Sequence, residues 1–180
     1  MKPPTGAERV AYKSAESGNI GLGMQEGASQ LKNTSRERTF IMIKPDGVQG
    51  GFVGTIISRF EAKGFQLNAM KFMQATSERL EEYYQDLKEK DFFNKLVEYV
   101  GSGPICCMVW EGEQAIATGR KMLGATDPDD SNVGTIRFDL SIRVERNVCD
   151  ASDSTEAARR EIQLWFEQQE VVSWNNHSNN

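Results

Sequence analysis

The chain has 180 residues, a length that favours one ordinary domain with enough sequence to bury a hydrophobic core. Its 21 basic and 26 acidic side chains give a net charge of −5, which argues against a nucleic-acid backbone as the main partner. The single histidine, His177, lies close to the C-terminus. The body of the chain therefore lacks the histidine that a Ser-His-Asp triad needs, and it has no histidines for a metal site with several histidine ligands.

The first 37 residues differ in composition from the rest of the chain. They combine scattered glycine, serine and lysine with isolated apolar residues, which bury too little surface to offset the entropy of ordering. We therefore predict a disordered extension over 1–37, a folded domain over 38–172 and a polar tail over 173–180. Organelle targeting is the alternative for the extension, although targeting peptides are richer in arginine and poorer in acidic residues.

Three cysteines, Cys106, Cys107 and Cys149, have neither the spacing of a metal site nor the number of a disulfide framework. They indicate buried, reduced thiols of an intracellular protein. No apolar run approaches the roughly 20 residues of a membrane helix. These features favour the cytoplasm and argue against a membrane partner.

From residue 38 onward, strand-like and helix-like segments alternate. An apolar run predicts a strand at 40–43, and the following Lys44–Gly47 predicts a turn. Helical spacing follows from Val53 to Phe60, and then the pattern predicts a strand at 65–73, helices at 77–87 and 92–100, a strand at 104–110 and a helix at 113–123.

The last third of the chain predicts an acidic loop at 127–132, a strand at 142–149 and a helix that begins near 153–156 with a pattern resembling a capping box. This alternation predicts an α/β or α+β fold with one sheet and helices packed on it. The order of elements does not separate a doubly wound sheet from a split β-α-β arrangement.

No glycine-rich phosphate loop occurs in the sequence. The candidate phosphate-binding residues are dispersed instead, at Lys44, Arg120, Thr126 and Arg137. Lysine and arginine at the ends of elements can converge on a phosphate through charge-assisted hydrogen bonds. Taken singly, each of these side chains fits an ordinary surface position better than a binding site.

Several motifs occur in a fixed order: Arg38–Val48, Ser102–Pro104 with Met108–Gly112, Gly134–Arg137, and Arg146–Val148 followed by Ser152–Ser154. Together they closely resemble the nucleoside diphosphate kinase family over about residues 37–172. The resemblance implies a ferredoxin-like β-α-β-β-α-β core with an antiparallel sheet. It also implies transfer of the γ-phosphate from a nucleoside triphosphate to a nucleoside diphosphate through a phosphohistidine, with Mg²⁺ arriving on the nucleotide.

The resemblance also assigns site residues by position. The phosphates would be held by Lys44, Arg120, Thr126 and Arg137, with Tyr84 beside the reacting phosphate. Phe92 and Val144 would contact the base, and Asn147 would bond the ribose. Ser152 and Glu161 would orient the acceptor. Family members assemble as hexamers or tetramers, so we expect a homo-oligomer, more often a hexamer, or a mixed oligomer with active members.

Three of these residues have a simpler interpretation. Phe92 begins an apolar helical stripe, and periodicity alone makes it as consistent with the core as with base stacking. Tyr84 and Val144 are equally consistent with packing.

The acceptor position itself departs from the family pattern. Asp150 stands where the family has its histidine, and Ala151 replaces a glycine beside it. Phe138 also replaces a glycine, Gly50 stands where an arginine is common, and Asp91 replaces a usual proline.

The substitution leaves three hypotheses. The first is a nucleotide-binding protein that is inactive or strongly impaired in transfer, because a carboxylate repels a phosphate and is shorter than histidine. The second is a phosphotransferase or hydrolase that works through Asp150 as an acyl-phosphate acceptor. The third is a structural subunit that assembles with active family members. We do not expect His177, in a terminal tail, or Cys149, on the opposite strand face, to replace the acceptor.

Overall fold

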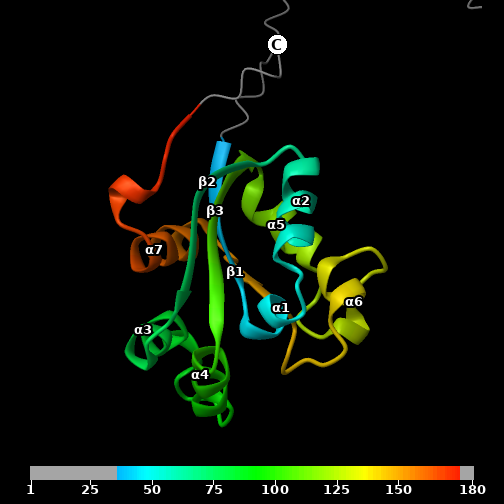
Figure 1. The fold of residues 1–180 in the computed structure, drawn as a ribbon, viewed down its shortest axis with the longest axis vertical. Helices are drawn as coiled ribbons and strands as arrows, with labels where there is room; N and C mark the ends of the chain where they lie inside the picture. The colour runs from blue at the N-terminus through cyan, green and yellow to red at the C-terminus, as the bar shows by residue number, and fades with distance from the viewer. Residues whose placement is uncertain (1–35, 175–180) are drawn as a thin grey trace, which may run out of the picture. The chain divides into compact units, whose positions relative to one another are not determined.

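The computed structural model describes residues 36–174. The predicted extension lies almost entirely outside these residues, as does His177. Within the described residues, four strands form one antiparallel sheet in the order β2-β3-β1-β4 (Figure 1). The strands are β1 (Arg36–Ile43), β2 (Gln66–Gln74), β3 (Pro104–Glu113) and β4 (Cys149–Ala151).

Helices connect these strands and extend the chain beyond β4. They are α1 (Pro45–Gln49), α2 (Val53–Ala62), α3 (Ser77–Tyr83), α4 (Phe93–Gly101), α5 (Ala115–Leu123), α6 (Ile136–Leu140) and α7 (Thr155–Trp165). Short 3-10 helices lie at Gln85–Leu87, Pro128–Asp130 and Gln168–Glu170. The strand order and the antiparallel pairing confirm the predicted ferredoxin-like β-α-β-β-α-β core.

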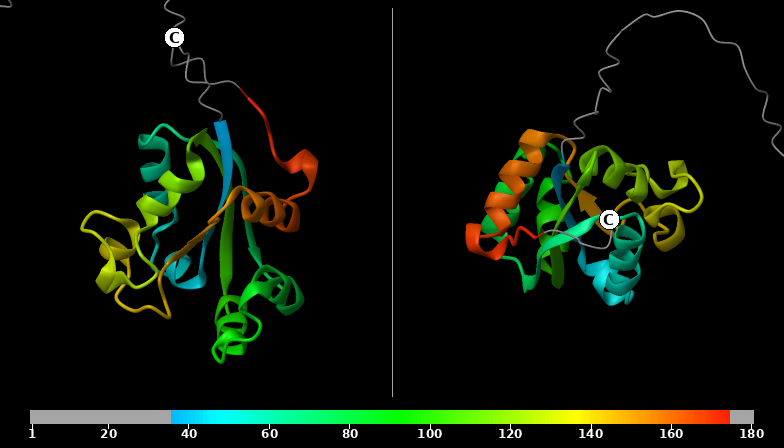
Figure 2. Two further views of the ribbon diagram at one scale, coloured as in Figure 1. Left: turned by 180° about the vertical axis from the view of Figure 1, so that it is seen from behind. Right: turned by 90° about the horizontal axis from the view of Figure 1, so that it is seen from above.

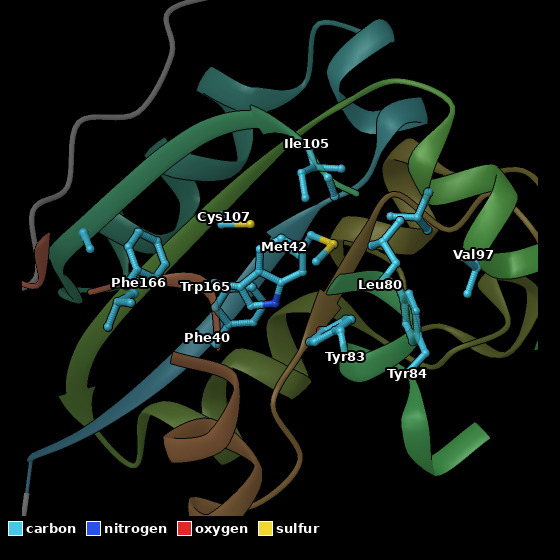
Figure 3. Close-up of a cluster of buried hydrophobic side chains, with 14 of the residues drawn as sticks. Phe40, Met42, Leu80, Tyr83, Tyr84, Val97, Ile105, Cys107, Trp165 and Phe166 are labelled. Carbon is cyan, nitrogen blue, oxygen red and sulfur yellow. The ribbon is translucent and has the colours of Figure 1, made fainter. Parts of the chain in front are cut away.

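The sheet has a hydrophobic core on each face, because successive side chains along a strand point to opposite sides. On one face, Phe40 and Met42 of β1 pack against α3, α4 and α7, and Trp165 stacks on Phe40 with ring centroids 6.1 Å apart (Figure 3). On the other face, Ile41 and Ile43 pack against α2 and α5. Figure 2 shows these two helical layers on either side of the sheet.

Most predicted elements are confirmed, with shifted ends. The helix that begins at Val53 ends before Gly64, whose φ of +90° favours a residue without a side chain. The last predicted helix is α7, and the Ser154 hydroxyl caps it by accepting a hydrogen bond from the Ala157 amide at 3.1 Å.

Two local predictions are wrong. Lys44–Gly47 does not form a simple turn, because Pro45 starts helix α1, where a missing amide hydrogen costs nothing. The predicted strand at 142–149 shortens to β4, since 142–148 contains only an isolated bridge between Arg143 and Arg146. Ser141 folds this segment back on itself by donating to the carbonyls of Arg143 and Arg146. Helix α6, capped by Thr135, had no prediction.

The C-terminal segment returns to the sheet after α7. The Val172 amide donates to the Asn68 carbonyl at 2.8 Å, and the Trp174 indole donates to the Leu67 carbonyl at 3.0 Å. Ser173 accepts a hydrogen bond from Arg38 at 2.7 Å. The first residues of the predicted polar tail are therefore bonded to β1 and β2. Among the helices described, none is both long and apolar enough to cross a membrane.

The close approach of β3 to Phe65 gives a test of the packing on the α2 face. A Cβ added at Gly112 would lie 2.2 Å from the Phe65 ring, so we expect Gly112→Ala to lower the free energy of unfolding by about 1–3 kcal/mol. Gly54, on the exposed side of α2, has open space around it, and Gly54→Ala should change stability by no more than about 0.5 kcal/mol. Urea denaturation of both variants measures the difference. Equal stabilities would contradict the packing.

Candidate functional site

The candidate site forms where β4 pairs with the end of β1. Asp150 pairs with Met42, so its side chain lies on the sheet face that holds Tyr84. The Tyr84 hydroxyl donates to Asp150 Oδ2 at 2.6 Å. Lys44 Nζ lies 3.6 Å and Arg137 Nη2 lies 3.9 Å from Asp150 Oδ1. The Asp150 side chain remains 22% exposed, which leaves it open to a ligand.

These contacts keep Asp150 charged. Burial raises the pKa of its carboxyl, but Lys44, the Tyr84 hydrogen bond and Arg137 together outweigh burial and hold the pKa below its ordinary value. Burial, with the Asp150 charge added to it, raises the pKa of the Tyr84 hydroxyl, so this group stays a hydrogen-bond donor. The centre of the site at neutral pH is therefore a carboxylate facing two cations.

Lys44 reaches Asp150 from the start of α1. Its side chain is only 4% exposed, and its ammonium donates to Asn147 Oδ1. The Asn147 amide in turn donates to the Thr126 carbonyl at 2.9 Å. The structure therefore brings Lys44 and Asn147, two of the residues that the resemblance assigns to the site, into direct contact. The predicted ribose contact of Asn147 stays a prediction, and its amide is already engaged with protein groups.

Arg137 fastens the loops around the site. Its guanidinium donates to the carbonyls of Gly124 at 3.1 Å, Asn147 at 3.3 Å and Cys149 at 2.7 Å. These bonds satisfy a buried cation and hold the chain on both sides of Val148. A role in phosphate binding stays a prediction, and it would have to coexist with this structural role.

The remaining predicted ligand contacts lie at the surface. Phe92 is 51% and Val144 is 42% exposed, so the interpretation of Phe92 as a core residue is wrong. Arg120 is exposed on α5 with Nη1 3.4 Å from the Ala151 carbonyl, and Thr126 is also exposed. These side chains are free to meet a ligand, and base stacking on Phe92 stays a prediction.

Ser152 and Glu161 form a buried pair behind Asp150. The Ser152 hydroxyl donates to Glu161 Oε2 at 2.5 Å and accepts from the Phe40 amide at 3.1 Å. Burial raises the pKa of Glu161 to about 7, although the Ser152 hydrogen bond opposes that shift. Ser152 follows Asp150 by two residues in the sequence, and the role of this pair in orienting the acceptor position stays a prediction.

The sequence did not predict the hydrogen bonds that link Tyr99 through Asp46 to Val148, two residues before Asp150. Val148 has a φ of 69°, an unfavourable conformation for a β-branched residue. The Val148 amide donates to Asp46 Oδ2 at 2.9 Å, and the Tyr99 hydroxyl donates to Asp46 Oδ1. Arg146 lies over the Tyr99 ring. Asp46 stands in the quoted Lys44–Gly47 motif, but no signal in the sequence links it to Tyr99 or to Val148.

The described residues contain no cluster of three or more histidine, cysteine, aspartate or glutamate side chains able to hold a metal ion. The three cysteines are buried, as predicted, whereas their reduced state and an intracellular location stay predictions. Cys149 lies on the opposite sheet face from Asp150, in the core under α2 and α5. Among the departures from the family pattern, Phe138 is 44% exposed on α6 and Asp91 is exposed.

A ferredoxin-like sheet with two buried cations, a buried amide and exposed aromatic and arginine side chains defines a class of α/β proteins suited to phosphate-bearing ligands. Comparison with known proteins specifies the class. The family model described as nucleoside diphosphate kinase matches residues 37–171. The chain therefore belongs to the nucleoside diphosphate kinase family.

Individual relatives agree with this assignment. A nucleoside diphosphate kinase from Neurospora crassa is 55% identical over 145 residues, which cover 81% of this chain and 95% of the relative. Nucleoside diphosphate kinase B of Mus musculus is 56% identical over 138 residues, covering 77% and 91%. The structure of a halophilic nucleoside diphosphate kinase from Halobacterium salinarum in complex with CDP matches with a TM-score of 0.77 and 42% identity, covering 79% of this chain and 95% of that chain.

The raised pKa of Glu161 gives a pH test. Between about pH 4.5 and pH 7 the folded protein keeps a proton that the unfolded chain releases, so stability should fall as the pH rises through this window and level off above it. For the wild type we expect the free energy of unfolding to fall by about 2–3 kcal/mol over this window. Glu161→Gln, which keeps an acceptor for Ser152, should not show this fall. Thermal unfolding at pH 5 and pH 8 measures it. Glu81→Gln, an exposed change on α3, should leave the wild-type slope in place.

Proposed function

We propose that this protein binds nucleoside di- and triphosphates but is inactive, or strongly impaired, in passing the γ-phosphate of a triphosphate to a diphosphate. The observation that carries this proposal is the state of the acceptor position. Asp150 is an ionised carboxylate, bonded to Tyr84 and paired with Lys44 and Arg137. By the family resemblance, Lys44, Tyr84 and Arg137 match the family pattern, whereas Asp150 and the neighbouring Ala151 depart from it.

The residues around Asp150 support nucleotide binding. Lys44 and Arg120 offer cationic donors for the phosphates, and Phe92 and Val144 offer exposed apolar surface for the base. The relative from Halobacterium salinarum has CDP in its structure. Mg²⁺ would enter with the nucleotide, because a polyphosphate carries its own oxygen ligands for this ion.

The same geometry opposes transfer. At an effective dielectric constant of about 20, a carboxylate 4 Å from a phosphate charge is repelled by about 4 kcal/mol. The Tyr84 hydroxyl already occupies Asp150 Oδ2, which further reduces its reactivity. Aspartate is also shorter than histidine, and a displacement of about 1 Å costs on the order of a hundredfold in rate.

Nucleotide binding is tested by thermal unfolding with ADP or ATP and magnesium. We expect a rise in melting temperature, because a ligand at 100 times its Kd stabilises the folded state by about 2.7 kcal/mol. Arg120→Gln should reduce the affinity about tenfold through loss of one cationic donor. Lys121→Gln, an exposed change on the same helix, should not. No stabilisation by either nucleotide at millimolar concentration would overturn the proposal.

Asp150→His tests whether only the nucleophile is lost. We expect γ-phosphate transfer to rise on the order of a hundredfold or more over wild type, because Tyr84, Lys44 and the Ser152–Glu161 pair remain in place. A coupled kinase assay measures the rate. A second variant that adds Phe138→Gly and Ala151→Gly restores two more family residues. If both variants bind nucleotide but transfer no phosphate, the pocket has lost more than its nucleophile.

A working enzyme is the alternative, favoured by the exposed 22% of the ionised Asp150 side chain. In that reaction a carboxylate oxygen would bond to the γ-phosphorus and the diphosphate would leave, giving an aspartyl phosphate. Labelled ATP distinguishes the two functions, because hydroxylamine removes an acyl phosphate. Label that Asp150→Asn abolishes would establish the alternative.

Assembly is a further part of the proposal. β2 is an edge strand, and Met70 and Phe72 on it are 55% and 63% exposed, which favours contact with another subunit. We propose a homo-oligomer, with a hexamer favoured over a tetramer. A structural subunit in a mixed oligomer with active family members is the alternative, and co-purification of such members would support it. Three buried, free cysteines fit a reducing compartment such as the cytoplasm.

A further inference from the structure

The negative charge of Asp150 faces the two buried cations of the site, Lys44 and Arg137. Lys44 Nζ and Arg137 Nη2 both face Asp150 Oδ1, at 3.6 and 3.9 Å, and the Tyr84 hydroxyl bonds to the other oxygen. The contacts of an ammonium, a guanidinium and a hydroxyl with one anion are those that a phosphate group attracts.

We propose that the Asp150 carboxylate acts as a permanent substitute for a terminal phosphate, so that this site prefers nucleoside diphosphates to nucleoside triphosphates. The inference rests on the proposed function, because it requires a nucleotide to bind here. It adds the ligand class and the residue that selects it.

The partners of the two cations restrict their movement toward a longer ligand. Arg137 donates to three backbone carbonyls, and Lys44 donates to the Asn147 side chain. Either cation would have to give up bonds within the protein to follow a terminal phosphate outward. Leaving such buried groups unpaired is unfavourable. The two cations can therefore contact phosphates that bind directly beside them. They contact a further, terminal phosphate poorly.

Asp150 is held as firmly as the cations. It lies within β4, where it pairs with Met42. Just beyond the end of β4, the Ser152 amide donates to the Phe40 carbonyl at 3.1 Å, which extends the pairing with β1. Protonation does not remove the charge either, since its pKa lies below the ordinary value. A ligand phosphate directed at this position meets a fixed negative charge.

The exposed side chains indicate the orientation of the ligand. Phe92 and Val144 provide apolar surface for a base, whereas the buried charges lie at Lys44, Arg137 and Asp150. The polyphosphate would therefore extend from the exposed rim toward Asp150. The third phosphate of a triphosphate would lie closest to the Asp150 carboxylate. It would add negative charge where Asp150 already offsets part of the charge of the two cations, so its binding is unfavourable.

Isothermal titration of the full chain with ADP and with a non-hydrolysable β,γ-imido analogue of ATP, both in excess magnesium, tests the inference. We expect the diphosphate to bind at least about tenfold more tightly, a difference of about 1.4 kcal/mol. Asp150→Asn keeps the shape and an acceptor for Tyr84 but removes the charge, so the two affinities should become equal within about twofold. Asp150→His, with an uncharged ring, is a second variant with the same expectation.

Asp153→Asn is the matched control, because it makes the same change of net charge at an exposed position three residues further along the chain. It should keep the wild-type preference. Equal binding of the two nucleotides by wild type would overturn the inference while leaving the proposed function standing. A preference that persists in both Asp150 variants would also overturn it. Binding of neither nucleotide would instead overturn the proposed function, and the inference with it.

Discussion

The buried ammonium of Lys44 and the carboxylate of Asp150 depend on each other. A lysine side chain that is 4% exposed is stable as a cation only beside an anion or several acceptors, and here it has Asp150 and the Asn147 oxygen. In this chain the Asp150 carboxylate already offsets part of the positive charge of Lys44 and Arg137 without a ligand. Asp150 therefore determines the electrostatics of the whole site.

This balance depends on a backbone that holds Asp150 in place. Val148 has an unfavourable φ of 69°, which costs on the order of 1–3 kcal/mol. Its amide donates to Asp46, and its carbonyl accepts from the Lys44 amide at 2.8 Å. Both backbone groups of Val148 therefore bond to residues at the start of helix α1. Without these bonds the loop would relax, and Asp150 would no longer face the cations.

The sequence predicted those parts of the fold whose signal is local. Apolar spacing located α2 and the core strands, and Ser154 located the start of α7, because these patterns depend on residues a few positions apart. The strand predicted at 142–149 failed for a physical reason. Ile142 and Val144 imitate an alternating strand, but they are 91% and 42% exposed and have no neighbouring strand to pair with. Strand pairing depends on distant residues, which periodicity does not report.

The candidate site shows the same limit more clearly. The family resemblance supplied Lys44, Arg137 and Asn147, and the structure brings them together. It did not supply the link from Tyr99 through Asp46 to Val148, which joins residues about fifty and a hundred positions apart. Nor did it show that the donors of Arg137 are bonded to carbonyls. A motif records which residue types occur, whereas a hydrogen bond depends on where the fold places each atom.

The fold places Asp150 outside both hydrophobic cores. Both hydrophobic cores are built from β1, β3 and the helices around them, and Asp150 belongs to neither. Tyr84 links this core to the site, because its ring packs in the core under α3, α4 and α7 while its hydroxyl bonds to Asp150. Because the Asp150 carboxylate accepts from this hydroxyl and faces both cations, these buried polar groups of the site have partners. Asp150 is thus separate from the packing of either core, whereas its charge determines the electrostatics of the site.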